Sequence, residues 1–189
     1  MKLMEEKIWQ ECKILSGSVL KVSSFLNHQL DTQFIMELGK EFARLFAKEA
    51  PTKILTIESS GIAIAFAAGA AMKIPVLFAK KHKTSNVSGE TYHSVVHSYT
   101  HDCDYTVIVE SEYLRPGDRV LLIDDFLANG NALEGLLDIV SQAGAVAVGA
   151  GVAIEKGFQE GGKRLRASGL RVEPLAVINY MDDYGVVFD

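Results

Sequence analysis

Apolar runs alternate with segments of helical periodicity along most of the chain. Continuous apolar runs are typical of strands that are buried on both faces of a sheet. In other segments, apolar side chains recur every three or four residues, which is the spacing of a helix with one buried face. Strands are expected at residues 53–57, 75–79, 119–123, 146–154 and 171–178. Helices are expected at residues 2–12, 32–48, 62–72, 131–143 and 160–167.

This alternation predicts an α/β fold with a central, mainly parallel sheet flanked by helices. Asp31 precedes the second helix and is expected to cap its amino end. The 189 residues fit one domain. Residues 181–185 are expected to turn between two strands. Ligands of such sheets lie beyond the carboxyl ends of the strands, so the site is expected there.

A polar segment, about residues 80–107, interrupts the pattern. A polar stretch of this length between two strands is usually a functional loop or disordered. Within it, residues 92–99 alternate well enough to pair with residues 105–110 as a hairpin. Two interpretations stay open at this point, namely a surface hairpin and a lid that closes over the site.

Three histidines in this segment, His93, His97 and His101, are spaced four residues apart. On a helix they would share one face. The residues between them favour a strand, in which residues four apart lie roughly 13 Å apart, too far to share one zinc ion. We therefore expect a solvated hairpin here and no metal held by the protein.

Composition narrows the class of protein. The net charge is −5, which argues against a protein that binds nucleic acid through a basic face. Cys12 and Cys103 are too few for a disulfide framework and are expected to be reduced thiols. The amino terminus carries Glu5 and Glu6 where a signal peptide needs apolar residues, and residues 62–72 are too short to span a membrane. We expect a cytoplasmic protein with neither membrane nor nucleic acid as a partner.

The segment VLLIDDFLANGNA, residues 120–132, combines the features of a phosphate site and a sugar site. Small residues and a glycine let the backbone approach a phosphate closely, and amides at a helix amino terminus bind anions. Carboxylates at a strand end can accept hydrogen bonds from sugar hydroxyls. The alternative is an ordinary turn with an Asn cap and two exposed acids. The residues concerned are the pair Asp124 and Asp125 and the loop Ala128, Asn129, Gly130, Asn131 and Ala132.

This segment resembles the motif by which type I phosphoribosyltransferases bind phosphoribosyl diphosphate (PRPP). It departs from the motif at Asn129 and Ala132, where hydroxyl residues are usual, so the backbone amides would carry more of the 5′-phosphate contact. Together with LKVSSFLNHQLD, TIESSGIA, FAKKHK and VAIEKGFQ, it resembles the bacterial xanthine phosphoribosyltransferases along nearly the whole chain. The loop pattern Ala-Asn-Gly-x-Ala is characteristic of that subfamily.

The resemblance implies the type I phosphoribosyltransferase fold, with a small hood built from about residues 1–35, and an enzyme of purine salvage. Such an enzyme transfers the 5-phosphoribosyl group of PRPP, bound with Mg²⁺, to N9 of xanthine and forms xanthosine 5′-monophosphate (XMP) and pyrophosphate. The family is commonly homodimeric. Asp124 and Asp125 would contact the ribose as the catalytic pair, and the loop 128–132 would hold the 5′-phosphate. The resemblance assigns pyrophosphate to Glu58, Ser59, Ser60, Gly61 and Lys81, and xanthine to Leu20, Asn27 and Lys156.

Alternatives remain from the residues alone. The Ser-Ser-Gly turn is an anion site or a capping turn, and the choice of Lys81 over Lys80 rests on the resemblance. Without the resemblance, Asn27 would be interpreted as a turn residue and Lys156 as a surface lysine. The alternative functions are transfer to guanine or hypoxanthine and a non-catalytic PRPP sensor. A sensor would need a DNA-binding module, and the sequence shows no helix-turn-helix.

Overall fold

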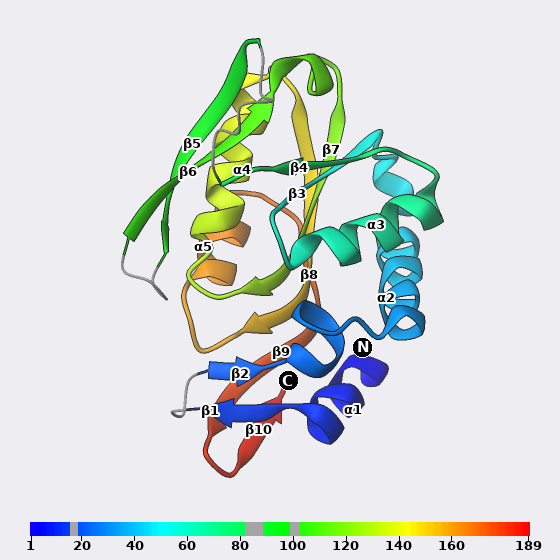
Figure 1. Ribbon diagram of the computed structural model, residues 1–189, viewed down its shortest axis with the longest axis vertical. Helices are drawn as coiled ribbons and strands as arrows, with labels where there is room; N and C mark the ends of the chain where they lie inside the picture. Colours follow the sequence, from blue (N-terminus) through cyan, green and yellow to red (C-terminus); the bar gives the residue numbers. More distant parts are fainter. Residues whose placement is uncertain (16–18, 82–88, 99–102) are drawn as a thin grey trace.

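The computed structural model describes residues 1–15, 19–81, 89–98 and 103–189 of the chain. A six-stranded sheet forms its centre, in the order β10-β9-β8-β7-β3-β4 (Figure 1). All neighbouring strands are parallel except the edge strand β10, which runs antiparallel to β9. The predicted α/β fold with a mainly parallel sheet is confirmed. The strands are β3 (Lys53–Ile57), β4 (Val76–Ala79), β7 (Arg119–Leu127), β8 (Val146–Lys156), β9 (Val172–Asp182) and β10 (Gly185–Phe188).

Helices cover both faces of this sheet (Figure 1). Successive residues of β7 point to opposite faces, so Leu121 and Ile123 join the core beneath α2 and α3. Val120 and Leu122 join a second core beneath α4 and α5. The helices are α1 (Lys2–Glu11), α2 (Thr32–Leu45), α3 (Gly61–Met72), α4 (Asn131–Gln142) and α5 (Gly161–Ala167).

Helix α2 begins where the sequence predicts and ends earlier. The Asp31 side chain accepts a hydrogen bond from the backbone N–H of Phe34 at 3.1 Å, which confirms the predicted cap. The helix ends at Leu45 rather than Lys48, and a short 3₁₀ turn, η2 (Ala47–Glu49), follows. Pro51 disfavours helical backbone in the residue before it, and the chain turns there into β3.

The predicted hairpin is also present. Strand β5 (Thr91–Ser98) pairs antiparallel with β6 (Cys103–Glu110), and a short 3₁₀ turn, η3 (Ser111–Tyr113), follows. Val96 and Val107 are buried in the core that includes α4. Residues 82–88 and 99–102 lie outside the described part of the chain. The segment interpreted as a lid, about residues 80–107, lies partly in these ranges, and His101 lies wholly in them.

The amino-terminal elements lie together beside β9 and β10 (Figure 1). After α1 come the antiparallel strands β1 (Lys13–Leu15) and β2 (Val19–Lys21) and a π-helical turn, η1 (Ser23–Asn27). β1 and η1 were not predicted, because neither of these short segments shows a clear period. Asp183 and Tyr184 form the predicted turn between β9 and β10.

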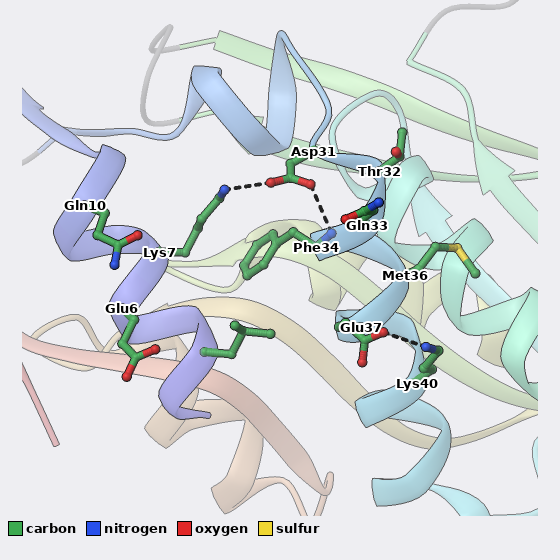
Figure 2. A pocket seen from close by; sticks show the side chains of 11 residues that line it. Glu6, Lys7, Gln10, Asp31, Thr32, Gln33, Phe34, Met36, Glu37 and Lys40 are labelled. Carbon is green, nitrogen blue, oxygen red and sulfur yellow. Dashed lines mark hydrogen bonds and ion pairs between the residues drawn. The ribbon is translucent and has the colours of Figure 1, made fainter.

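A lysine joins α1 to the amino end of α2 (Figure 2). The ammonium nitrogen Nζ of Lys7 lies 2.7 Å from Asp31 and 2.6 Å from Glu11. A groove of about 680 Å³ lies between these two helices. It contains none of the residues that the sequence predicts for the site.

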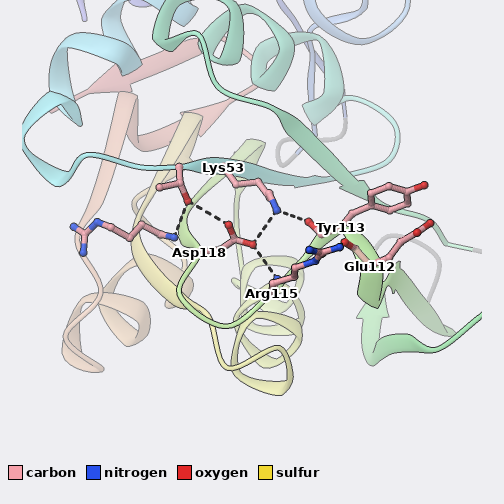
Figure 3. Close-up of polar contacts among 7 residues, drawn as sticks. Lys53, Glu112, Tyr113, Arg115 and Asp118 are labelled. Carbon is pink, nitrogen blue, oxygen red and sulfur yellow. Dashed lines mark hydrogen bonds and ion pairs between the residues drawn. The ribbon is translucent and has the colours of Figure 1, made fainter.

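The amino-terminal edge of the sheet is held by a separate polar network (Figure 3). The Lys53 ammonium donates to the Asp118 carboxylate at 2.8 Å and also to the carbonyl of Tyr113. Asp118 accepts in addition the backbone N–H of Arg115 at 2.9 Å. This network connects the starts of β3 and β7, at the opposite edge from the carboxyl ends. Among the described residues, no helix is long and apolar enough to cross a membrane.

Candidate active site

The two aspartates of the motif lie inside β7 and not after it. The strand runs on to Leu127, past the predicted end at Ile123. It pairs with β8 as far as Leu127, whereas its pairing with β3 stops at Leu122. Among the described residues, the last part of β7 therefore has a strand neighbour on one side only. The sequence prediction placed the strand end too early, because a carboxylate inside a buried strand runs against the usual pattern.

Asp124 is a buried acid next to a second acid. Its residue is 4% exposed, and its Oδ1 accepts the backbone N–H of Asp125 at 2.9 Å. Burial raises the pKa of Asp124 well above its ordinary value, and the neighbouring charge of Asp125 raises it further. Asp125 is partly exposed and accepts the backbone N–H of Phe126 at 3.0 Å. A buried carboxyl of this kind has lone pairs available to hydroxyl donors from a ligand.

The predicted phosphate loop lines one cavity with Asp124. The cavity has a volume of about 190 Å³ and is bounded by the whole loop 128–132, by Asp124 and Phe126, and by residues of the hairpin. Gly130 has φ +85°, a conformation that favours glycine. Helix α4 begins directly after it, so the unpaired amides of the first turn lie at this cavity. Asn131 Nδ2 donates to the carbonyl of His97 at 3.1 Å and so joins the loop to β5.

The predicted pyrophosphate loop reaches the same acid from β3. It comprises Glu58 to Gly61, and the peptide bond between Glu58 and Ser59 is cis. A Cβ atom added at Gly61 would lie 2.3 Å from Thr56 Oγ1 and 3.2 Å from Asp124 Oδ1. The backbone at Gly61 therefore lies close against Asp124. The structure brings the two predicted anion loops together around one carboxylate.

Lys80 and Lys81 have different surroundings. The Lys81 backbone N–H donates to the Glu58 carboxylate, and its ammonium lies 5.0 Å from the centre of the Tyr105 ring. The charge of Lys81 lowers the pKa of Asp124, against the larger effects of burial and Asp125. Lys80 pairs through its backbone with Ile108 and lines a different cavity. The geometry thus places Lys81 beside the two loops.

Two of the three predicted base-binding residues, Leu20 and Asn27, line different cavities. Leu20 is buried and lines a cavity of about 200 Å³ near Trp9. Asn27 is exposed and lines an apolar groove of about 530 Å³ that includes Ser59 and Ser60. Lys156 is the last residue of β8. Their shared role stays a prediction.

Lys156 has an aromatic neighbour that the sequence analysis did not single out. Its ammonium lies 5.9 Å from the centre of the Phe126 ring, and burial lowers its pKa. Phe126 also lines the cavity of the phosphate loop. Tyr105 also lines that cavity, although it lies in β6 and not in the motif. Phe126 follows the acid pair directly, so its place in the motif was the available signal, whereas no local signal marked Tyr105.

Comparisons with known proteins show which family the chain belongs to. A sequence profile described as "Phosphoribosyl transferase domain" matches residues 21–183. A xanthine phosphoribosyltransferase of Moorella thermoacetica is 53% identical over 178 residues, which cover 94% of this chain and 91% of that protein. Xanthine phosphoribosyltransferase 1 of Clostridium perfringens is 51% identical over 189 residues, which cover 100% of both chains.

Solved structures show the same fold at low sequence identity. Adenine phosphoribosyltransferase from Giardia lamblia, complexed with 9-deazaadenine, superposes with a TM-score of 0.77 at 18% identity. The match covers 92% of this chain and 96% of that one. Adenine phosphoribosyltransferase from Rhodothermus marinus gives a TM-score of 0.75 at 21% identity, over 94% of this chain and 99% of that one.

Proposed function

This chain belongs to the phosphoribosyl transferase domain family, and on that premise we propose that it is a xanthine phosphoribosyltransferase. The enzyme is a pentosyltransferase of purine salvage that joins xanthine and PRPP to form XMP and pyrophosphate. The structural observation that carries the proposal is the cavity that buried Asp124 shares with the loop 128–132. The identity of about half of all residues with xanthine phosphoribosyltransferases, over the full length, supports xanthine as the base.

The loop and the acids hold the phosphoribosyl group. The amides of residues 128–132 and of the first turn of α4 bind the 5′-phosphate. Asp124 and Asp125 accept hydrogen bonds from the ribose 2′- and 3′-hydroxyls, which offset the cost of burying the Asp124 carboxylate. Both contacts fix the position of C1′, and this positioning lowers the barrier by making the reaction effectively unimolecular.

The leaving pyrophosphate is bound from the other side of Asp124. The amides at the start of α3 and the Lys81 ammonium lie where negative charge builds up as the C1′–O bond breaks. N9 of the base then forms the new bond to C1′, through a transition state with oxocarbenium character. The chain need supply no nucleophile, because the base itself attacks.

Mg²⁺ enters with PRPP in this proposal. Among the described residues, no group of three or more His, Cys, Asp or Glu side chains could hold a metal ion. Mg²⁺ commonly takes one or two carboxylates and completes its shell with water and phosphate oxygens. Asp124 and Asp125 fit that limited part of the shell. When bound, the ion neutralises charge on the pyrophosphate.

Asn27 and Lys156 are proposed to select the base. The Asn27 amide offers both a donor and an acceptor for an oxopurine edge. The Lys156 ammonium, half-buried beside Phe126, donates to O6 or N7 and favours xanthine, which carries a second carbonyl and ionises more readily than guanine or hypoxanthine. Leu20 packs against the base from β2.

A homodimer is proposed from the surface of α3. This helix, GIAIAFAAGAAM, has no polar side chain, yet Phe66 is 66% exposed. A helix that is apolar on all sides is normally buried. Phe66 lines the apolar groove of about 530 Å³ together with the exposed residues Leu30 and Met36. A second copy of the chain is the proposed cover of Phe66, and the part of the groove lined by Asn27, Ser59 and Ser60 is left to the substrates. Both cysteines are free thiols, in keeping with a cytoplasmic enzyme.

Product analysis tests the reaction directly. The protein is incubated with xanthine, PRPP and Mg²⁺, and the nucleotide and pyrophosphate are separated by chromatography. We expect XMP and pyrophosphate in equal amounts, and neither when PRPP or Mg²⁺ is omitted. Binding of PRPP without any nucleotide product would contradict the enzyme and favour a PRPP sensor.

A further inference from the structure

Helix α5 packs directly on the backbone of the loop 128–132, beside the start of α4 (Figure 1). The backbone N–H of Gly161 donates to the carbonyl of Ala128 at 3.1 Å. A Cβ atom added at Gly161 would lie 2.3 Å from that carbonyl oxygen and 2.6 Å from the nitrogen of Gly130. The first residue of α5 is therefore in close contact with the loop, and a larger residue there would push the loop away.

One arginine of α5 holds a second carbonyl of the loop. Arg164 Nη2 donates to the carbonyl oxygen of Asn129 at 2.6 Å. Its Nε donates to the Glu134 carboxylate, in the first turn of α4, at 2.7 Å. One guanidinium thus connects α5, the loop and α4. Because the fork of the guanidinium is rigid, these two contacts fix the direction of the Asn129 carbonyl.

The direction of this carbonyl sets the direction of a phosphate-binding amide. The carbonyl of Asn129 and the N–H of Gly130 belong to one planar trans peptide and point in opposite directions. The same holds for the carbonyl of Ala128 and the N–H of Asn129. Residues 128–132 line the cavity, whereas Gly161 and Arg164 do not. The carbonyls of Ala128 and Asn129 point towards α5, outside the cavity. The N–H groups of the same two peptides therefore point the opposite way, towards the interior of the cavity.

This arrangement matters because of the two departures in the loop. Asn129 and Ala132 carry no hydroxyl, so backbone amides supply more of the phosphate contact. Amides bind an anion well only when their directions are set before binding. We propose that Arg164 is a positioning residue, which presents the amides of the loop 128–132 to the 5′-phosphate without touching the substrate. This proposal rests on the proposed function of the loop.

The test compares Arg164→Met with Lys163→Met. Lys163 is the preceding residue of α5, is 70% exposed, and forms an ion pair with Glu160. Both variants remove one positive charge from the same helix, so the comparison separates a local role from a general effect of charge. The readouts are the KM for PRPP, the KM for xanthine, and the dissociation constant of ribose 5-phosphate measured by calorimetry.

For Arg164→Met we expect the KM for PRPP and the dissociation constant of ribose 5-phosphate to rise about five- to tenfold, as for loss of a charge-assisted hydrogen bond. The KM for xanthine should stay within about twofold, and Lys163→Met should match the wild type. Arg164→Lys should recover part of the loss, since an ammonium can make one of the two contacts. Glu134→Gln should shift the same constants in the same direction by less, and it serves if Arg164→Met fails to fold.

Two results would overturn the positioning role. One is unchanged binding of ribose 5-phosphate by Arg164→Met. The other is an equal rise in the KM of both substrates, which would indicate general loosening. Calorimetry with ribose 5-phosphate needs no turnover. A wild-type protein that forms no XMP but binds ribose 5-phosphate would therefore contradict the proposed function while still testing Arg164.

Discussion

The carboxylate of Asp124 accepts the backbone N–H of Asp125, at 2.9 Å, within one strand. The contact satisfies one lone pair of a residue that is 4% exposed, and leaves the acid beside a second negative charge. Burying a charge in this way costs stability unless a ligand offsets it. In the proposed function, the ribose hydroxyls of PRPP offset this cost when they bind.

Removal of this charge is predicted to stabilise the protein and impair the enzyme. The pKa of Asp124 is raised by folding, so its contribution to stability is present below the ordinary pKa and is lost as the pH rises through the raised value. Asp124→Asn should therefore raise the free energy of unfolding by about 1–3 kcal/mol near neutral pH.

Thermal unfolding at about pH 4 and about pH 8 checks the sign, with the gain expected at the higher pH only. XMP formation should fall at least about tenfold, because an amide is a weaker acceptor for ribose hydroxyls. A variant that is less stable than the wild type near neutral pH would contradict this account of Asp124.

Lys156 is predicted to act on the base alone. Lys156→Met should raise the KM for xanthine about tenfold or more, which corresponds to loss of a hydrogen bond from a charged donor. The KM for PRPP should change by less than about twofold and serves as the internal control. Steady-state kinetics with each substrate varied in turn measures both constants. Parallel increases in the two constants would remove Lys156 from base recognition.

Of the neighbouring lysines Lys80 and Lys81, only Lys81 is predicted to bind pyrophosphate, so Lys80 provides a matched control. Lys81→Met should raise the KM for PRPP about tenfold, since its ammonium lies near Asp124 and the pyrophosphate loop. Lys80→Met should have little effect, because Lys80 lines a different cavity. Inhibition by added pyrophosphate should weaken in the first variant only. The reverse ranking would show that the assignment of the two residues is wrong.

The apolar face of α3 gives a prediction about assembly. Phe66→Glu should convert the proposed dimer into a monomer, because it would place a charge inside an apolar interface. Sedimentation equilibrium measures the change. Tyr184→Glu is the control, since Tyr184 is 96% exposed in the β9–β10 turn, away from α3. A wild-type chain that is monomeric at every concentration would contradict the proposed interface.

Local patterns were sufficient for much of the fold. β3 matched its expected span, and Asp31 capped α2 as predicted, because both features depend on neighbouring residues. The end of β7 was not predictable in this way. Its last residues are held by pairing with β8, a contact between segments far apart in the sequence. Tertiary pairing thus overrides the usual exclusion of acids from a strand.

The candidate site likewise combines features of contiguous residues with contacts between residues distant in the sequence. The acid pair and the loop 128–132 are contiguous, so their chemistry could be inferred from the sequence. The contact of Arg164 with Asn129 joins residues 35 positions apart, and nothing in the sequence near Arg164 distinguishes it from a solvated surface charge. The assignment of Leu20, Asn27 and Lys156 to the base depended on the family resemblance, because these residues are scattered along the sequence.

The most direct test of the central claim is the selectivity of the wild-type enzyme among purines. The kcat/KM of xanthine, guanine, hypoxanthine and adenine is measured side by side at one saturating concentration of PRPP with Mg²⁺. The account predicts that xanthine exceeds each other base by at least about tenfold, the discrimination given by one buried hydrogen bond to a charged group. Equal or better use of another base would contradict the assignment of xanthine.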